Sequence, residues 1–409
     1  MDSFEYSPNA LLIPTPIENV PKLPAGRLPL MAFVDGESER VLNESPVQQA
    51  LGRGLIMRGG ITKAIEYLGA QRSPNLLIVD ISGVELPVSQ VNSLADVCEP
   101  GVTVIAIGDR NDVGLYRDLI DAGVADYIVK PLTRELVAKA LAPRTAPGEL
   151  GRTGLKLGKM VAFIGVRGGA GATTLAVNLS WYLANRQARR VALVDLDLQH
   201  GDCALALNIK PTAGFREALA NPLRIDNLLL DRIMTPHGER LFVLSAEEPL
   251  HEHLQFTADA VDTLFSVLRS QFHYVIVDVP RNPAPPYRRA LDIADLRVFV
   301  GDQTMRSVRD LVRQRAALGE GSAEHRNLFV LNRQGEGGRH AVPLKDMHAV
   351  LQLRPNSVIP FQPALLTAAS TNGQVAVARR GKFANAVAGL ALELSGRTRE
   401  RRGWWRAKK

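Results

Sequence analysis

Cysteine is scarce: this 409-residue chain has two, Cys98 and Cys203, which stand far apart in the sequence. Neither has a second cysteine two or three residues away, which excludes a disulfide framework and a cysteine-ligated iron–sulfur or zinc centre. Two isolated thiols are typical of a reducing compartment, and we expect a cytoplasmic protein. The eight histidines show no HExxH spacing, and we interpret none of them as a metal ligand.

Long apolar runs are missing as well. No stretch of about 18 apolar residues occurs, so the sequence predicts no membrane-spanning helix. Residues 1–27 contain five prolines and early acidic residues but no apolar core, which favours a flexible leader over a signal peptide. The hydrophobic content of 46% is that of an ordinary globular protein with a sizeable core.

Basic charge is unevenly placed along the chain. Residues 397–409 hold seven Lys and Arg against one Glu, and so carry +6 of the formal net charge of +7. The remainder is close to neutral, so we expect no nucleic-acid-binding face on it. Trp404 and Trp405 lie among these basic residues, a pattern that fits peripheral contact with anionic lipid. A disordered, solubilising tail explains the same residues equally well.

The stretch 160–202 contains a strand, a glycine-rich turn, a helix and a second strand. Residues 160–165 and 191–194 have the apolar pattern of buried strands, and the residues from Thr173 onward have helical spacing. The turn RGGAG at 167–171 can direct backbone N–H groups at an anion near a helix N-terminus. This βαβ unit therefore predicts a phosphate-binding loop.

The loop departs from the standard P-loop pattern at two positions. Ala172 stands where that pattern has Lys, and Val166 stands where it has its first Gly. Thr173 occupies the position of the hydroxyl that binds Mg²⁺. From the loop alone, a deviant P-loop and an ordinary glycine-rich turn explain the residues equally well. Asp278, at the end of the apolar run 274–278, favours the P-loop, because such proteins hold their metal with a carboxylate in this place.

Alternating strand and helix patterns predict two α/β domains. Residues 28–141 contain short apolar strands at 30–34, 76–79, 102–107 and 125–129, with a weak strand near 55–57. Five strands in this arrangement predict a flavodoxin-like domain. Residues 142–158 are rich in Pro, Gly and charge, and we interpret them as a linker. Residues 159–396 alternate strands and helices again, which predicts a doubly wound parallel sheet.

The first domain resembles a response-regulator receiver. Asp80 lies at the phosphoacceptor position, Lys130 at the position of the Lys that precedes a Pro, and Asp35 at one of two acidic metal ligands. The sequence departs from that pattern at the second acid, which is Gly36, and at the hydroxyl residue after the fourth strand, which is Gly108. Asp80 is either a phosphoacceptor or a strand-end carboxylate paired with Lys130. A receiver fold used for docking or dimerisation fits both alternatives.

The second domain, from about 159 to 395, resembles the MinD/ParA group of deviant Walker A ATPases. The resemblance rests on residues 167–174, on Asp195 and Asp197 at the switch I DxD, on Asp278 at Walker B and on SVRD at 307–310. A small residue in place of the loop Lys, with Arg at the signature position, resembles the CpaE/TadZ branch of that group. The fold implied is a flavodoxin-like receiver-type domain followed by a doubly wound, parallel-sheet P-loop domain.

This resemblance implies ATP and Mg²⁺ as ligands and a homodimer as the assembly. The nucleotide would be bound by Arg167, Gly168, Gly169, Ala170, Gly171, Ala172, Thr173, Thr174 and Asn332. The metal would be held by Thr173, Asp195 and Asp278, and the catalytic residue that orients the attacking water would be Asp197. Arg167 would replace the missing Lys and link ATP binding to dimerisation.

Each of these residues also has an ordinary structural explanation. Arg167 could be a solvated loop residue, and Asp195 with Asp197 could be an N-cap pair at a strand end. Asn332 could be a turn residue after a strand.

The CpaE/TadZ resemblance implies a cytoplasmic factor, peripheral on the inner membrane and polar, that helps to place or assemble a Flp/Tad-type pilus secretion machine. Its partners would be pilus and secretion proteins, and ATP hydrolysis would be weak or absent because the loop lacks Lys. Two alternatives stay open: a cycling ParA/MinD-like positioning ATPase on membrane or chromosome, and a regulator controlled by phosphorylation of Asp80.

Overall fold

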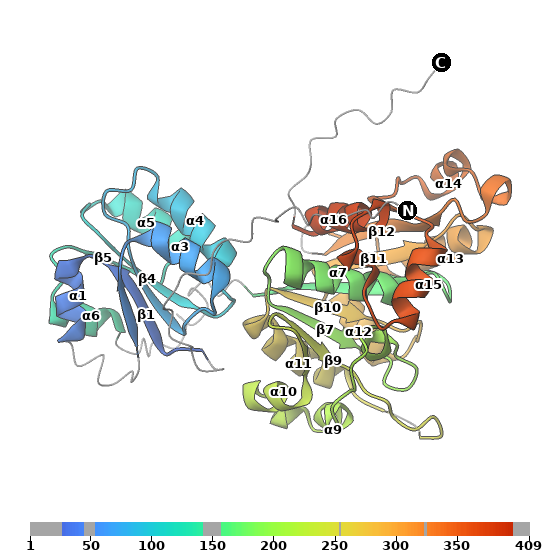
Figure 1. Cartoon of the computed structure of the whole chain (residues 1–409), viewed down its shortest axis with the longest axis horizontal. Coiled ribbons are helices and arrows are strands. Elements are labelled where there is room, and N and C mark those ends of the chain that lie inside the picture. The colour runs from blue at the N-terminus through green and yellow to red at the C-terminus, as the bar shows by residue number, and fades with distance from the viewer. Residues whose placement is uncertain (1–26, 45–53, 142–156, 253–254, 323–324, 396–409) are drawn as a thin grey trace, which may run out of the picture.

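The structure is a computed structural model that describes residues 27–44, 54–141, 157–252, 255–322 and 325–395 (Figure 1). The predicted leader up to residue 26, most of the predicted linker and the basic segment 397–409 lie outside the described residues. Within the described ranges, no helix combines the length and apolar character needed to cross a membrane. Two separate sheets carry the fold.

The first sheet has five parallel strands in the order β2-β1-β3-β4-β5, which is the flavodoxin-like order that the sequence predicts. Its strands are β1 (Leu30–Val34), β2 (Leu55–Arg58), β3 (Leu76–Asp80), β4 (Thr103–Gly108) and β5 (Asp126–Val129). Its helices are α1 (Gly36–Asn43), α3 (Ile61–Ala70), α4 (Pro87–Val97), α5 (Val113–Asp121) and α6 (Arg134–Leu141). Helices α3, α4 and α5 share a core with one face of the sheet, and α1 and α6 share a core with the other.

The second sheet has eight strands in the order β13-β12-β11-β6-β10-β7-β9-β8, all parallel except β8 at the edge. Its strands are β6 (Lys159–Gly165), β7 (Val191–Asp195), β8 (Thr235–His237), β9 (Leu241–Leu244), β10 (Tyr274–Asp278), β11 (Leu296–Gly301), β12 (Arg326–Gln334) and β13 (Ser357–Pro360). The α/β fold class with a doubly wound parallel sheet is thereby confirmed.

Helices cover both faces of the second sheet (Figure 1). Those on one face are α7 (Ala172–Arg186), α8 (Cys203–Ala206), α15 (Pro363–Thr371) and α16 (Lys382–Ser395), with the 3₁₀ turn η3 (Ala376–Ala378). Those on the other are α9 (Phe215–Ala220), α10 (Asn227–Ile233), α11 (Ala258–Gln271), α12 (Pro285–Asp292), α13 (Met305–Leu318) and α14 (Leu344–Leu351). Two further 3₁₀ turns are η1 (Pro222–Arg224) and η2 (Gly338–His340).

Burial on both faces explains why these strands read as continuous apolar runs. All five residues of β7, and six of the seven in β6, are buried. Polar side chains enter where the parallel strands end, because there the chain leaves the core. The carboxyl ends of β6, β7, β10 and β11 thus gather the candidate site on one edge of the second sheet.

Candidate nucleotide site

The loop after β6 has the backbone of an anion cradle. Gly169 and Gly171 take φ values of +73° and +92°, a region that L side chains rarely adopt. A Cβ on Gly171 would also lie 2.4 Å from the amide nitrogen of Asn332, so this position requires glycine for space as well as conformation. Helix α7 begins at Ala172, and Thr173 and Thr174 stand in its first turn, where backbone N–H groups have no partner within the helix.

Two aspartates face one another across the neighbouring strand ends. Asp195 of β7 and Asp278 of β10 are direct partners in the strand register, and both are buried. The Thr173 hydroxyl donates to Asp278 Oδ2 at 2.5 Å, so the loop and the strand-end carboxylate are in contact. Asp197 is half-buried and accepts the His200 N–H at 2.9 Å. The fold therefore places these residues, which were predicted from the sequence, close together at one edge of the sheet.

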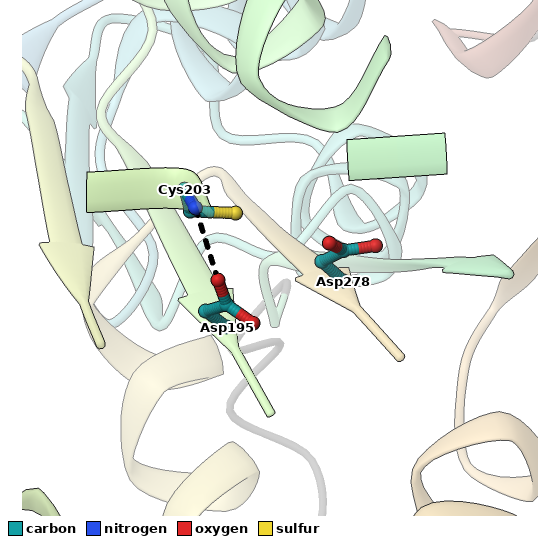
Figure 2. A group of neighbouring side chains, drawn as sticks. All are labelled: Asp195, Cys203 and Asp278. Carbon is teal, nitrogen blue, oxygen red and sulfur yellow. Dashed lines mark hydrogen bonds between the residues drawn. The ribbon is translucent and has the colours of Figure 1, made fainter. Parts of the chain in front are cut away.

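Cys203 is a neighbour of this pair that the sequence analysis did not use (Figure 2). It opens α8, and its N–H donates to Asp195 Oδ2 at 3.1 Å, while the N–H of Asp197 donates to Asp195 Oδ1. One ligand atom from each of Asp195, Cys203 and Asp278 lies within 4.8 Å of the others. No motif in the sequence marked Cys203, because it approaches Asp195 only through the turn at Gly201.

Burial raises the pKa of both carboxyl groups. Burial raises the pKa of Asp278 to about 7, and the charge of Asp195 adds to this while the Thr173 hydrogen bond opposes it. Burial likewise raises the pKa of Asp195 to about 6, against the lowering effect of its backbone hydrogen bonds. A proton or a cation stabilises such a pair, so a divalent metal fits between the loop and the strand ends.

Arg167 is neither solvated nor free. Its side chain is 19% exposed, and Nε donates to Asp302 Oδ2 at 2.9 Å while Nη1 donates to the Gly168 carbonyl. The alternative explanation, a solvated loop residue, is therefore wrong, because the Asp302 carboxylate directly after β11 binds the guanidinium. The predicted role of Arg167 in nucleotide binding stays a prediction. Asp302 was not identified from the sequence, where a single Asp after a strand carries no distinctive pattern.

Asn332 lies within β12, so its interpretation as a turn residue is wrong. It is buried, and its side-chain amide donates to the Ala170 carbonyl at 2.8 Å. This contact joins β12 to the loop and holds the loop from the side opposite Asp278. A role in binding the adenine base stays a prediction.

A second polar cluster lies in the first domain. Lys130 Nζ is 2.6 Å from Asp35 Oδ2 and 2.6 Å from Asp80 Oδ2, so the three residues predicted from the receiver pattern do meet. Partial burial alone would raise the pKa of Asp35, but the hydrogen bonds from Lys130 and Ser38 lower it to about 2. Lys130 thus bridges the two carboxylates, and the contact is compatible with both alternatives for Asp80.

The missing hydroxyl at Gly108 has a structural reason. A Cβ on Gly108 would lie 2.5 Å from the Tyr127 hydroxyl oxygen, and that hydroxyl donates to the Arg110 carbonyl at 2.8 Å. Tyr127 therefore occupies the space in which a receiver carries its Ser or Thr. Whether Asp80 accepts phosphate stays a prediction.

The comparisons with known proteins concern mainly the second domain. The family model described as cellulose biosynthesis protein BcsQ matches residues 158–332. The septum site-determining protein MinD of Synechocystis sp. is 28% identical over 156 residues, 38% of this chain. The chain spans 57% of the length of that protein, and of the MinD of Bacillus subtilis.

Solved structures show the same fold. The ParA family ATPase from Chlorobium tepidum is 18% identical, with a TM-score of 0.52 over 58% of this chain and 98% of that chain. MinD from Pyrococcus horikoshii, complexed with Mg-ADP, is 23% identical, with a TM-score of 0.50 over 58% of this chain and 96% of that chain. The pilus assembly protein CpaE from Caulobacter crescentus is 30% identical, but its match covers 27% of this chain and 94% of that chain at a TM-score of 0.26. The second domain thus has the fold of the ParA and MinD structures, and its sequence is similar to MinD and, over residues 158–332, to the BcsQ family model.

Proposed function

We propose that this chain is an ATP-binding, dimerising factor that localises or assembles a Flp/Tad-type pilus secretion machine, with weak or no ATP hydrolysis. The observation that carries the proposal is the loop 167–174. Its glycine backbone and its contact from Thr173 to Asp278 are those of a nucleotide site, whereas Ala172 stands in place of the Lys that serves catalysis.

Each residue of the loop and the strand ends has a role in this proposal. The turn and the first turn of α7 would bind the phosphates through backbone N–H groups. Mg²⁺, when bound, would neutralise phosphate charge, and the residues placed to hold it are Thr173, Asp195 and Asp278. Asp197 would orient water. Hydrolysis would be slow because no Lys neutralises the β- and γ-phosphate oxygens.

The pilus part of the proposal rests on domain composition. A receiver-type fold without the second acid and the hydroxyl is suited to docking, and it precedes the domain for which we propose ATP binding with weak hydrolysis. We propose a homodimer that acts peripherally at the inner membrane with pilus and secretion proteins as partners. Contact of residues 397–409 with anionic lipid belongs to the same proposal. A cycling ParA/MinD-like positioning ATPase is the alternative.

The nucleotide part is tested by measuring ATP binding and mass together. Calorimetry and light scattering with Mg²⁺ are expected to show that ATP converts the wild type to a dimer. Arg167→Ala should lose this dimer, whereas Arg313→Ala, an exposed arginine of α13, should retain it. If no ATP binds to the wild type, the nucleotide part is wrong.

The catalytic part is tested by restoring the missing charge. Ala172→Lys should raise the rate of phosphate release well above that of the wild type, because the side chain would reach the β- and γ-phosphates. A wild type that turns over as fast as this variant would contradict weak hydrolysis and favour the cycling alternative.

The pilus part is tested in the source organism. Deletion of the gene is expected to remove Flp-type pili seen by electron microscopy, and the wild-type gene but not Arg167→Ala should restore them. Intact pili together with misplaced septa or chromosomes would instead support the positioning ATPase.

A further inference from the structure

Arg167 is the only cation among residues 166–174, so it sets the side-chain charge of the loop. Two of its nitrogens, Nε and Nη2, donate to the same oxygen, Asp302 Oδ2, with Nε at 2.9 Å. The third, Nη1, donates to the Gly168 carbonyl at 2.6 Å. Each of the three guanidinium nitrogens therefore donates one hydrogen bond within its own chain.

Asp302 is a rigid partner for this cation. It is 2% exposed and directly follows β11, and its second oxygen accepts from the hydroxyls of Thr304 at 2.7 Å and Ser307 at 2.5 Å. Thr304 in turn caps α13 by accepting the Ser307 N–H. Burial alone would raise the pKa of Asp302, but the hydrogen bonds from Arg167, Ser307 and Thr304 lower it, so the carboxylate is ionised at neutral pH.

We propose that Asp302 is a positioning residue for Arg167, and that phosphate at the loop competes with this carboxylate for the guanidinium. The competition rests on the proposed function, because it requires that the loop bind ATP. With Ala172 in the Lys position and the Arg167 charge neutralised by Asp302, no side chain of residues 166–174 offers phosphate an uncompensated positive charge. Asp302 thus weakens nucleotide binding and makes occupancy depend on the opening of one ion pair.

The first measurement is the ATP affinity of Asp302→Asn by calorimetry at saturating Mg²⁺. The substitution keeps shape but removes the charge, and we expect ATP to bind about tenfold more tightly, the amount typical of one charged hydrogen bond. In the Arg167→Ala background the same substitution should change nothing. An equal gain in both backgrounds, or no gain in either, would overturn the competition.

Asp295→Asn is the matched control. Asp295 precedes the opposite end of β11 and also accepts an arginine, with Arg269 Nη2 at 2.9 and 3.0 Å from its two oxygens. Its substitution removes a carboxylate of the same kind far along the strand from the loop, so ATP affinity should stay that of the wild type. A tenfold gain here would show that the effect is not specific to Asp302.

The second measurement does not need ATP. An arginine-specific dicarbonyl reagent, read by peptide mass spectrometry, is expected to modify Arg167 several-fold more slowly than Arg313, whose side chain is 75% exposed. Asp302→Asn should raise labelling of Arg167 and leave that of Arg313 unchanged. Equal labelling of the two arginines in the wild type would overturn the positioning role even if the variant did not fold. If no variant binds ATP, the proposed function and the competition fail, and the labelling still decides the positioning role.

Discussion

At the scale of single residues, the feature that most constrains function is a pair of buried carboxylates, whose charged forms are disfavoured by burial and by their proximity. Asp195 and Asp278 are register partners; burial raises the pKa of both, and the charge of Asp195 raises that of Asp278 further. Neutral side chains there would stabilise the empty protein. The two carboxylates lower the stability of the fold unless a proton or a metal ion is bound, as expected of residues with a role in ligand binding.

This cost predicts a pH dependence of stability without metal. The native pKa of Asp278 is about 7, whereas an unfolded Asp has a pKa of about 3.9. Between these values the native state keeps a proton that the unfolded state has released, so stability falls as pH rises to about 7. Asp278→Asn lacks this loss, and its advantage in unfolding free energy should grow by about 3 kcal/mol from about pH 5 to about pH 8.

Urea denaturation in a chelator at several pH values measures this difference. Asp262→Asn, which alters an exposed acid paired with Arg289, should follow the wild type at every pH. Addition of Mg²⁺ at about pH 8 should stabilise the wild type but not Asp278→Asn. A constant difference between Asp278→Asn and wild type across the pH range would show that Asp278 is ionised at neutral pH.

Asp80 gives a second prediction at this scale. We expect no stable phosphate on Asp80 from a small phosphodonor, because Gly36 supplies no second acidic metal ligand beside Asp35. Intact-protein mass spectrometry with Mg²⁺ and acetyl phosphate measures this. A mass gain of one phosphoryl group that disappears in Asp80→Asn would contradict it and favour the regulator alternative.

At the scale of elements, the loop between β6 and α7 is held on three sides. Asp278 accepts from Thr173, Asn332 donates to the Ala170 carbonyl, and Asp302 accepts from Arg167. These contacts come from β10, β12 and the end of β11. The contacts of Thr173 and Ala170 therefore fix the loop backbone before any ligand arrives, which is the preorganisation that phosphate binding requires, whereas the contact of Asp302 engages the Arg167 side chain.

Two glycines of this loop provide a matched test of that rigidity. Gly171→Ala should destabilise the fold by at least about 1 kcal/mol and abolish ATP binding, because its φ is +92° and its Cβ would meet Asn332. Gly168→Ala has no atom within 4 Å of the new Cβ and should cost little. Thermal scanning and calorimetry distinguish them. Equal behaviour of the two variants would mean that the loop adapts freely.

The sequence predicted much of this arrangement, for reasons that differ between elements. Strand ends and the glycine turn follow local patterns, so Thr173, Asp195 and Asp278 could be placed together without coordinates. Asp302 could not be placed there, because its contact with the loop depends on β11 lying beside β6, and no local sequence pattern indicates the order of the strands. The edge strands β8 and β9 were not predicted for a different reason: they pair over three residues, too few to give a clear alternating pattern in the sequence.

At the scale of the whole molecule, the two domains meet through a buried charge cluster. Glu99, in the turn before β4, is 3.0 Å from Arg27 and 3.5 Å from Arg72 of its own domain, and 3.8 Å from Arg190 of the other. Arg190 directly precedes β7 and is 5% exposed, with its guanidinium over the rings of Phe242 and Phe272. The first domain therefore supplies the second with a carboxylate for a buried cation.

Removal of that carboxylate should weaken the whole molecule. Burial lowers the pKa of Arg190 to about 10 and the charge of Glu99 opposes this, so the side chain stays charged at neutral pH and Glu99→Gln leaves it uncompensated. We expect a loss of about 3 kcal/mol in unfolding free energy by urea denaturation. Glu39→Gln, which breaks an exposed pair with Arg58, should cost less than about 1 kcal/mol.

The double variant Glu99→Gln/Arg190→Met separates a cross-domain effect from a local one. If the domains depend on each other through this pair, Arg190→Met should recover part of the stability lost in Glu99→Gln, because no buried cation is left without a partner. Losses that simply add would place the effect of Glu99 on Arg27 and Arg72, within the first domain. Because Arg190 directly precedes β7 and Asp195 is its last residue, recovery would also mean that the first domain stabilises the strand that ends at the proposed metal ligand.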